Sequence, residues 1–294
     1  MDMKILIVSI LMTLCLALDV HGQPAANDKK PVTPAADSIN VWTPTLATGL
    51  NISQIAFSNW TQGGTDALAW TATVDGSYDY KGKIWKLQNH LRASYGRSQL
   101  GGAAAITTDN NLLIENVLTY NLGWATNPFV SNTIITTLAE GYSYATSVPV
   151  PIANFFDPGY VTQSIGFAYS NSNNFTTRLG VATQEIFANK FRQYTDNPNT
   201  PNKLEAFKLE TGFESVSRAK LHVANNMLLT TGLRLFTRFS NLTVWDVRWD
   251  NLIVAKVNSI INVNFTYELV YQKDQSPRTQ MKEGLQLGVT YSIF

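Results

Sequence analysis

The chain has 294 residues and carries 22 Lys and Arg against 21 Asp and Glu. This balance provides neither a basic excess for binding nucleic acid nor an acidic tail, so nucleic acid is not an expected partner. Charged residues make up 15% of the chain, below the roughly 25% of soluble domains. Thr, Asn, Ser and aromatic residues take their place, which favours strands and turns over helices.

The N-terminal segment has the pattern of a targeting sequence. Lys4 supplies a positive charge, and an apolar stretch follows from Ile5 to Leu18. This stretch is shorter than the about 20 residues of a spanning helix, so it predicts a cleaved signal peptide over residues 1–22. Cys15, the one cysteine, lies within it. The mature chain is therefore expected to have no thiol, no disulfide and no cysteine metal site.

Residues 23–41 are rich in Pro, Ala and charge and show no apolar period. This composition predicts a flexible periplasmic linker. It separates the predicted signal peptide from residues 42–294, where a different pattern begins.

From Trp42 onward, apolar and polar residues alternate, which is the period of a β-strand with one apolar face. The clearest example is residues 261–271, where Ile261, Val263 and Phe265 alternate with Asn262 and Asn264. The same alternation predicts strands within 68–80, 85–95, 207–214, 245–257 and 285–293. The stretch from Phe129 to Tyr142 has no clear register.

Turn-forming residues separate these segments, with short connections alternating with longer ones. Short turns are expected at 81–83, 125–128, 171–173, 217–219 and 258–259, and longer connections at 60–64, 96–108, 145–158, 189–202 and 272–279. About 12 strands result, with about 21 residues for each strand and its connection, which suits membrane crossings of about 10 residues.

The alternation fits a soluble sandwich or a membrane barrel, because the pattern does not say which face meets water. The even number of long strands, the aromatic residues near predicted strand ends and the terminal Phe294 favour the barrel. The expected fold is all-β, a single closed antiparallel transmembrane β-barrel over residues 42–294. Short turns would face the periplasm and longer loops the outside, in the cell outer membrane.

Four segments resemble a known family. Phe57 to Gly64 (FSNWTQGG) precedes Ala67-Leu68-Ala69-Trp70; Gly82-Lys83-Ile84-Trp85 follows, and the chain ends in Gly288 to Phe294 (GVTYSIF). This arrangement is similar to an uncharacterised outer-membrane barrel family of the Bacteroidota, the domain of unknown function 3078. The resemblance implies an outer-membrane location and names neither a substrate nor a catalytic residue.

Charged and polar residues on the non-lipid face are the sharpest site candidates, because exposing a charge to hydrocarbon costs about 2–4 kcal/mol at the membrane midplane. They suit either a polar channel that selects a solute by charge or a lattice of ion pairs that plugs a narrow barrel. The predicted lumen-lining residues are Lys86, His90, Arg92, Glu115, Arg178, Lys208, Glu210, Glu214, Arg234, Arg238, Arg248, Asp250, Lys256 and Glu268.

The predicted loop between the first two strands contributes a second set of candidates: Trp60, Gln62, Gly63 and Gly64. A recognition or gating loop would use them to contact a solute. The alternative is a tight turn whose Trp60 anchors at the membrane interface, and this is favoured because an interfacial Trp needs no ligand.

These observations leave three functions open. The first is a passive channel for a small polar solute, and the second is a scaffold barrel with a plugged lumen and a protein partner. The third, a lipid hydrolase, would need His90 or His222 beside a Ser on the outer wall, and the predicted register puts neither there. We expect no catalytic residue, metal or cofactor. Besides a solute, the expected partners are outer-membrane lipid and the barrel-assembly machinery during insertion.

Overall fold

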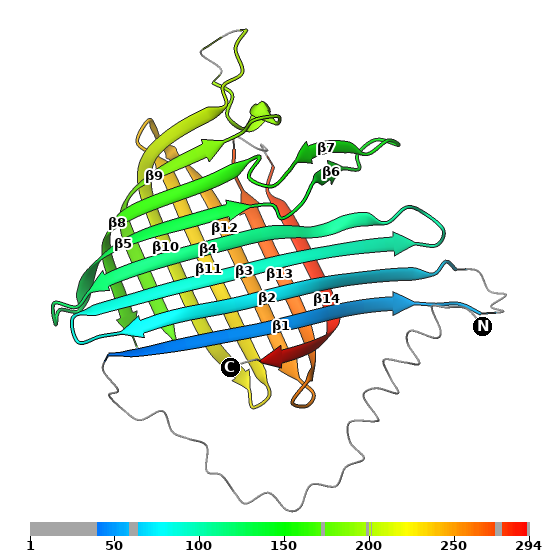
Figure 1. Ribbon diagram of the computed structural model, residues 1–294, viewed down its shortest axis with the longest axis horizontal. Coiled ribbons are helices and arrows are strands. Elements are labelled where there is room, and N and C mark those ends of the chain that lie inside the picture. Colours follow the sequence, from blue (N-terminus) through cyan, green and yellow to red (C-terminus); the bar gives the residue numbers. More distant parts are fainter. Residues whose placement is uncertain are drawn as a thin grey trace, which may run out of the picture. The chain divides into compact units, whose positions relative to one another are not determined.

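The computed structural model describes residues 40–58, 64–171, 174–197, 200, 202–273 and 278–292. Twelve of its strands form a closed antiparallel barrel, and β6 and β7 form a separate hairpin (Figure 1). Closure satisfies the backbone hydrogen bonds of every strand without leaving a sheet edge. The expected fold class is therefore confirmed. Within the described residues, no helix is long and apolar enough to cross a bilayer.

The barrel strands pair in the order β1-β14-β13-β12-β11-β10-β9-β8-β5-β4-β3-β2. Their bounds are β1 Val41–Ile55, β2 Ala67–Lys81, β3 Trp85–Leu100, β4 Ile106–Tyr120, β5 Thr126–Thr136, β8 Gly159–Asn171, β9 Phe175–Phe187, β10 Phe207–Ala224, β11 Met227–Arg238, β12 Asn241–Lys256, β13 Ile261–Tyr271 and β14 Gln280–Ser292. The hairpin β6 (Gly141–Ser143) and β7 (Val150–Ala153) lies in the connection between β5 and β8, and η1 (Arg192–Tyr194) in that between β9 and β10.

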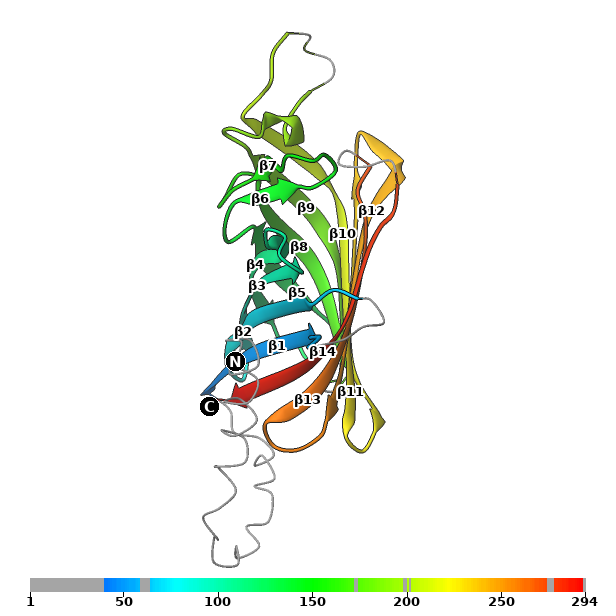
Figure 2. The ribbon, with the colours of Figure 1, turned by 90° about the vertical axis from the view of Figure 1, so that its right-hand side faces the viewer.

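Short and long connections fall at opposite ends of the barrel. The end that holds the start of β1 and the end of β14 has short connections. The other end carries the longer ones, including the one with β6 and β7 (Figure 2, upper left), except for the tight turn at 239–240 and the five residues 101–105. The longer connection expected at 96–108 is therefore wrong in its extent, because β3 continues to Leu100 and β4 begins at Ile106. The turn expected at 217–219 is wrong, because β10 continues to Ala224. Ser217, Arg218 and Ala219 pair there with β9 and β11. Small and polar residues marked a turn in the sequence, but both neighbouring strands keep this segment extended.

The outer face carries the apolar side chains of the alternation. On β14, Leu285, Leu287 and Tyr291 are all exposed. At the short-turn end, Trp42 stacks on Tyr78 with ring centroids 4.4 Å apart. Further along that end, on β3 and β4, Trp85 meets Tyr120 edge-on at 4.5 Å. Such a belt of amphipathic rings is typical of a barrel at a membrane interface.

Glycines on β8, β9 and β10 occupy interior positions where a side chain would meet the backbone of the neighbouring strand. A Cβ at Gly212 would lie 1.9 Å from the carbonyl oxygen of Thr237, and one at Gly180 would lie 2.4 Å from that of Ile165. Both obstacles are backbone atoms, which cannot move aside without disturbing the sheet. Gly232, on the neighbouring β11, has only the flexible Arg218 side chain nearby, at 3.9 Å.

Gly212→Ala is therefore expected to destabilise the barrel by about 1–3 kcal/mol, because the added methyl group overpacks the wall. Gly232→Ala is the matched control, with little effect expected. Heat-modifiable gel migration reports how much barrel is folded at each urea concentration. The measurement is the urea concentration at which half of the folded form is lost. Equal midpoints for the two variants would contradict the close approach at Gly212.

Candidate functional site

The even-numbered positions of β8 to β14 and the odd-numbered positions of β4 face the interior. The decisive contact is an ion pair between Arg218 on β10 and Glu115 on β4, because three strands lie between these two along the wall. Lys282 on β14 likewise reaches Asp109 on β4, at 3.3 Å from Nζ to Oδ1. Side chains on strands so far apart can meet only across the lumen.

Glu115 is the centre of this cross-lumen contact. Its two carboxylate oxygens accept hydrogen bonds from Arg178 on β9 and Arg218 on β10. Glu115 is 3% exposed and Arg178 is 8% exposed, so the charges compensate one another away from bulk water. The Arg178 guanidinium also lies over the Phe129 ring, 5.8 Å from its centroid. We call Glu115, Arg178 and Arg218 the central bridge.

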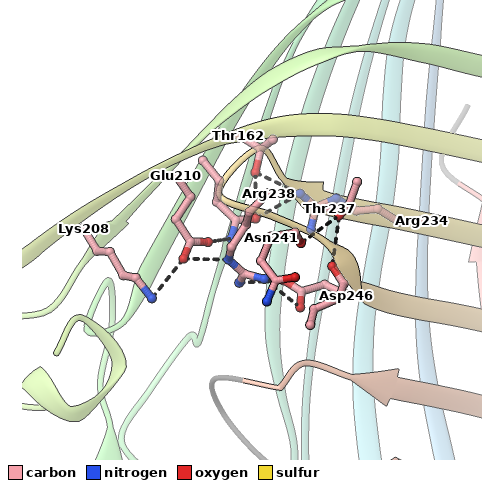
Figure 3. A network of polar contacts seen from close by, with 10 residues as sticks. Thr162, Lys208, Glu210, Arg234, Thr237, Arg238, Asn241 and Asp246 are labelled. Carbon is pink, nitrogen blue, oxygen red and sulfur yellow. Dashed lines mark hydrogen bonds and ion pairs between the residues drawn. The ribbon is translucent and has the colours of Figure 1, made fainter. Parts of the chain in front are cut away.

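A second network lies on β10, β11 and β12 (Figure 3). Glu210 forms ion pairs with Lys208 Nζ at 2.9 Å and with Arg238 Nε at 2.8 Å. Arg238 also pairs with Asp246 at 2.9 Å, so the charges alternate along a chain of four side chains. Each of the two acidic groups is at least nine-tenths buried.

Arg234 on β11 extends this network along the wall to β10, β9 and β8. Its Nε donates to Glu214 at 2.7 Å, and its Nη2 donates to Thr162 and to Gln184, both at 3.1 Å. These partners lie on β10, β8 and β9. One guanidinium thus ties together four strands, and a single substitution there would leave several buried polar groups without partners.

Both described histidines point inward rather than to the outer wall. His90 lies 3.3 Å from Asp75, which also binds Arg92 Nε at 2.8 Å. His222 occupies an interior position near the short-turn end of β10. The outer-wall arrangement that a lipid hydrolase would need is therefore not formed by either side chain.

At the long-loop end the interior opens into a cavity of about 510 Å³, which we call the vestibule. Arg248, Glu268 and Lys282 contribute charges to its lining, and Tyr142 and Tyr160 contribute phenols. Arg248 binds Asp250 at 3.1 Å and Glu268 at 2.6 Å. The hydrogen bond that Tyr142 donates to Glu140 raises the pKa of the Tyr142 phenol.

All fourteen residues expected in the lumen occupy interior positions of their strands. Twelve of them join the contacts described above. Lys86 and Lys256 lie nearer the short turns and form no ion pair within the described ranges. Whether these residues select a solute stays a prediction.

Sequence reasoning missed Arg218, Asp75, Asp246 and Gln184. Arg218 was assigned to a turn, while Asp75 and Asp246 belonged to polar faces without being chosen as candidates. Strand alternation could have identified all four. Among the loop candidates, Trp60, Gln62 and Gly63 lie outside the described residues. Gly64 has φ of +135°, and the Phe57 ring fills the space where a Cβ would lie.

A model of a family described as "Protein of unknown function (DUF3078)" matches residues 52–142. This match covers β2, β3, β4 and β5 and agrees with the resemblance noted in the sequence. The comparison with curated proteins gave no match.

Among solved structures, the chain is similar to bacterial outer-membrane barrels at low identity. The COG4313 outer membrane channel from Pseudomonas putida F1 is 12% identical, with a TM-score of 0.39, covering 90% of this chain and 98% of that one. The translocator domain of autotransporter NalP from Neisseria meningitidis is 10% identical, with a TM-score of 0.34, covering 98% and 95%.

Glu115→Gln is expected to destabilise the barrel by about 3–5 kcal/mol, because it leaves two guanidinium groups near each other without a counter-charge. Asp75→Asn is the control. Its side chain is 44% exposed, and loss of so exposed a pair costs about 0–1 kcal/mol. Urea unfolding followed by tryptophan fluorescence measures both variants. Equal losses for the two would mean that the central bridge is no more important than an exposed pair.

Proposed function

We propose that this chain is an outer-membrane barrel that forms a narrow channel for a small polar solute. The solute would enter the vestibule from the long-loop end and pass along the polar interior face. A membrane location is supported by the apolar outer face and the aromatic belt at the short-turn end. Because the interior charges are mixed in sign, charge alone favours no ligand class.

The observation that carries this proposal is the central bridge beyond the floor of the vestibule. Gln184 and Arg234 line the vestibule, and Arg234 binds Glu214, which lies four residues before Arg218 on β10. The vestibule therefore leads toward a point where Glu115 and Arg218 meet across the lumen. A polar passage narrowed by opposed charges can exclude large solutes and still admit small hydrated ones.

A scaffold barrel with a plugged lumen is the second candidate, and interior burial favours it. Gln184 is 2% exposed, Glu214 3% and Phe236 0%. Side chains packed this closely on β9, β10 and β11 leave that part of the lumen filled. Such a barrel would work through a protein partner bound at the long loops or at residues 23–41.

Conductance in planar bilayers separates these two functions. Arg218→Ser removes the cross-lumen arm of the central bridge and is expected to raise single-channel conductance severalfold, because it widens the constriction. Arg92→Ser is the matched control, since both arginine side chains are 41% exposed but Arg92 pairs with the neighbouring strand. Heat-modifiable migration establishes that each variant is folded. Absence of conductance in the wild type and in both variants would reject the channel and leave the scaffold barrel.

The membrane location has its own test on β14, where neighbouring residues face opposite sides. Leu285 is 66% exposed on the outer face, whereas Gln286 donates to Thr71 inside. Leu285→Arg is expected to cost about 2–4 kcal/mol on insertion into vesicles, because the charge would lie in hydrocarbon. Gln286→Arg keeps its charge in the polar interior and should insert more readily. The folded fraction of each variant after refolding into phospholipid vesicles measures the effect; an equal fraction would argue against lipid on this face.

A further inference from the structure

One region of the outer face departs from its apolar pattern. Asn116 on β4 pairs in register with Asn132 on β5, and Asn132 pairs with Gln163 on β8. Their chain neighbours Glu115, Ser131 and Ser164 face inward, so alternation places the three amides outside. We call Asn116, Asn132 and Gln163 the amide patch. It crosses three neighbouring strands of the wall (Figure 1).

The amide patch surrounds a groove of about 290 Å³ on the outer wall. Leu87, Leu118 and Val130 line the same groove, so polar groups are flanked by apolar ones. Asn132 lies near the middle of β5, and Gln163 lies within β8 rather than at its end. A barrel in a membrane would therefore hold part of this patch at the depth of the acyl chains.

Some polar side chains on the outer face have partners within the wall. Asn251 accepts a hydrogen bond from Thr231 at 2.7 Å and donates to the carbonyl oxygen of Tyr267 at 3.5 Å. Thr177 and Ser217 share a hydrogen bond of 2.8 Å. By contrast, no amide-patch side chain forms a hydrogen bond with any residue in the described part of the chain.

Unpaired amides in hydrocarbon are costly, because acyl chains offer neither donors nor acceptors. The region needs a partner that supplies both. Each carboxamide carries two N–H donors and one oxygen that can accept two hydrogen bonds, so the patch is complementary to itself. In a two-fold dimer the same patch meets its copy, and every donor can face an acceptor. Asn and Gln side chains also hold membrane-embedded segments together in other proteins.

We propose that the amide patch is the interface through which two copies of this chain associate in the membrane. Leu87, Leu118 and Val130 would close around the amide contacts and exclude lipid from them. The dimer rests on the membrane location proposed above, but not on the passage of a solute. Both barrels would keep their lumens independent.

Disulfide trapping tests this interface. Cys15 is the chain's one cysteine, so a Cys15→Ser background leaves a single introduced thiol. Val130→Cys lies beside the patch and is 52% exposed. Phe265→Cys is the control, since β13 lies six strands from β5 in either direction around the barrel. Oxidation in native membranes should give at least about tenfold more cross-linked dimer for Val130→Cys than for Phe265→Cys. Equal cross-linking would overturn the proposal.

A second experiment removes the amides and keeps their volume. In the Val130→Cys chain, the triple change Asn116→Leu, Asn132→Leu and Gln163→Leu should lower the cross-linked fraction by about tenfold. Retention of the dimer would overturn the proposed role of the amides. If the triple variant fails the heat-modifiability check, the comparison of single cysteines decides alone.

Native mass spectrometry of the wild-type barrel identifies what is bound at the amide patch. A mass of two copies supports the proposal, whereas a monomer carrying lipid or an unrelated protein on this face overturns it. Resistance of the protein to carbonate extraction is measured in parallel. A protein that resists extraction but stays monomeric rejects the interface alone, and a protein that is extracted rejects the membrane location.

Discussion

Glu115 balances two guanidinium groups that approach it from β9 and β10, and much of the interior depends on that balance. A buried carboxylate is stable only when its charge is compensated and its oxygens are hydrogen-bonded. The central bridge meets both conditions by drawing strands from opposite parts of the wall together. The number of strands and their stagger set the width of the barrel, and the central bridge spans it.

Two further groups of contacts line the interior toward the long-loop end. On β10 to β12, Glu210, Arg234 and Arg238 form short ion pairs and hydrogen bonds. On β4 and β14, Asp109 and Lys282 meet, and both line the vestibule together with Arg234. The physical difference between a channel and a plugged barrel is whether water passes between these pairs.

The outer wall follows the opposite rule. Some of its polar side chains satisfy one another within the sheet, as Asn251 does with Thr231. The amide patch has no such bonds among the described residues and spans three neighbouring strands, so it differs from a lone polar residue at a strand end. Isolated polar positions can be tolerated by local water, but a contiguous group at membrane depth calls for a partner.

Period-two alternation by itself determined the all-β class and placed residues such as Arg234 and Glu268 on the polar faces of their strands, while the turn residues added the count of about 12 strands. It could do so because each strand residue points to one of two sides, and hydrocarbon penalises charges on one of them. Only the tertiary structure decided that Arg218 lies in a strand and reaches Glu115. That contact joins residues 103 positions apart, and no local pattern encodes which distant strand faces which across a closed lumen.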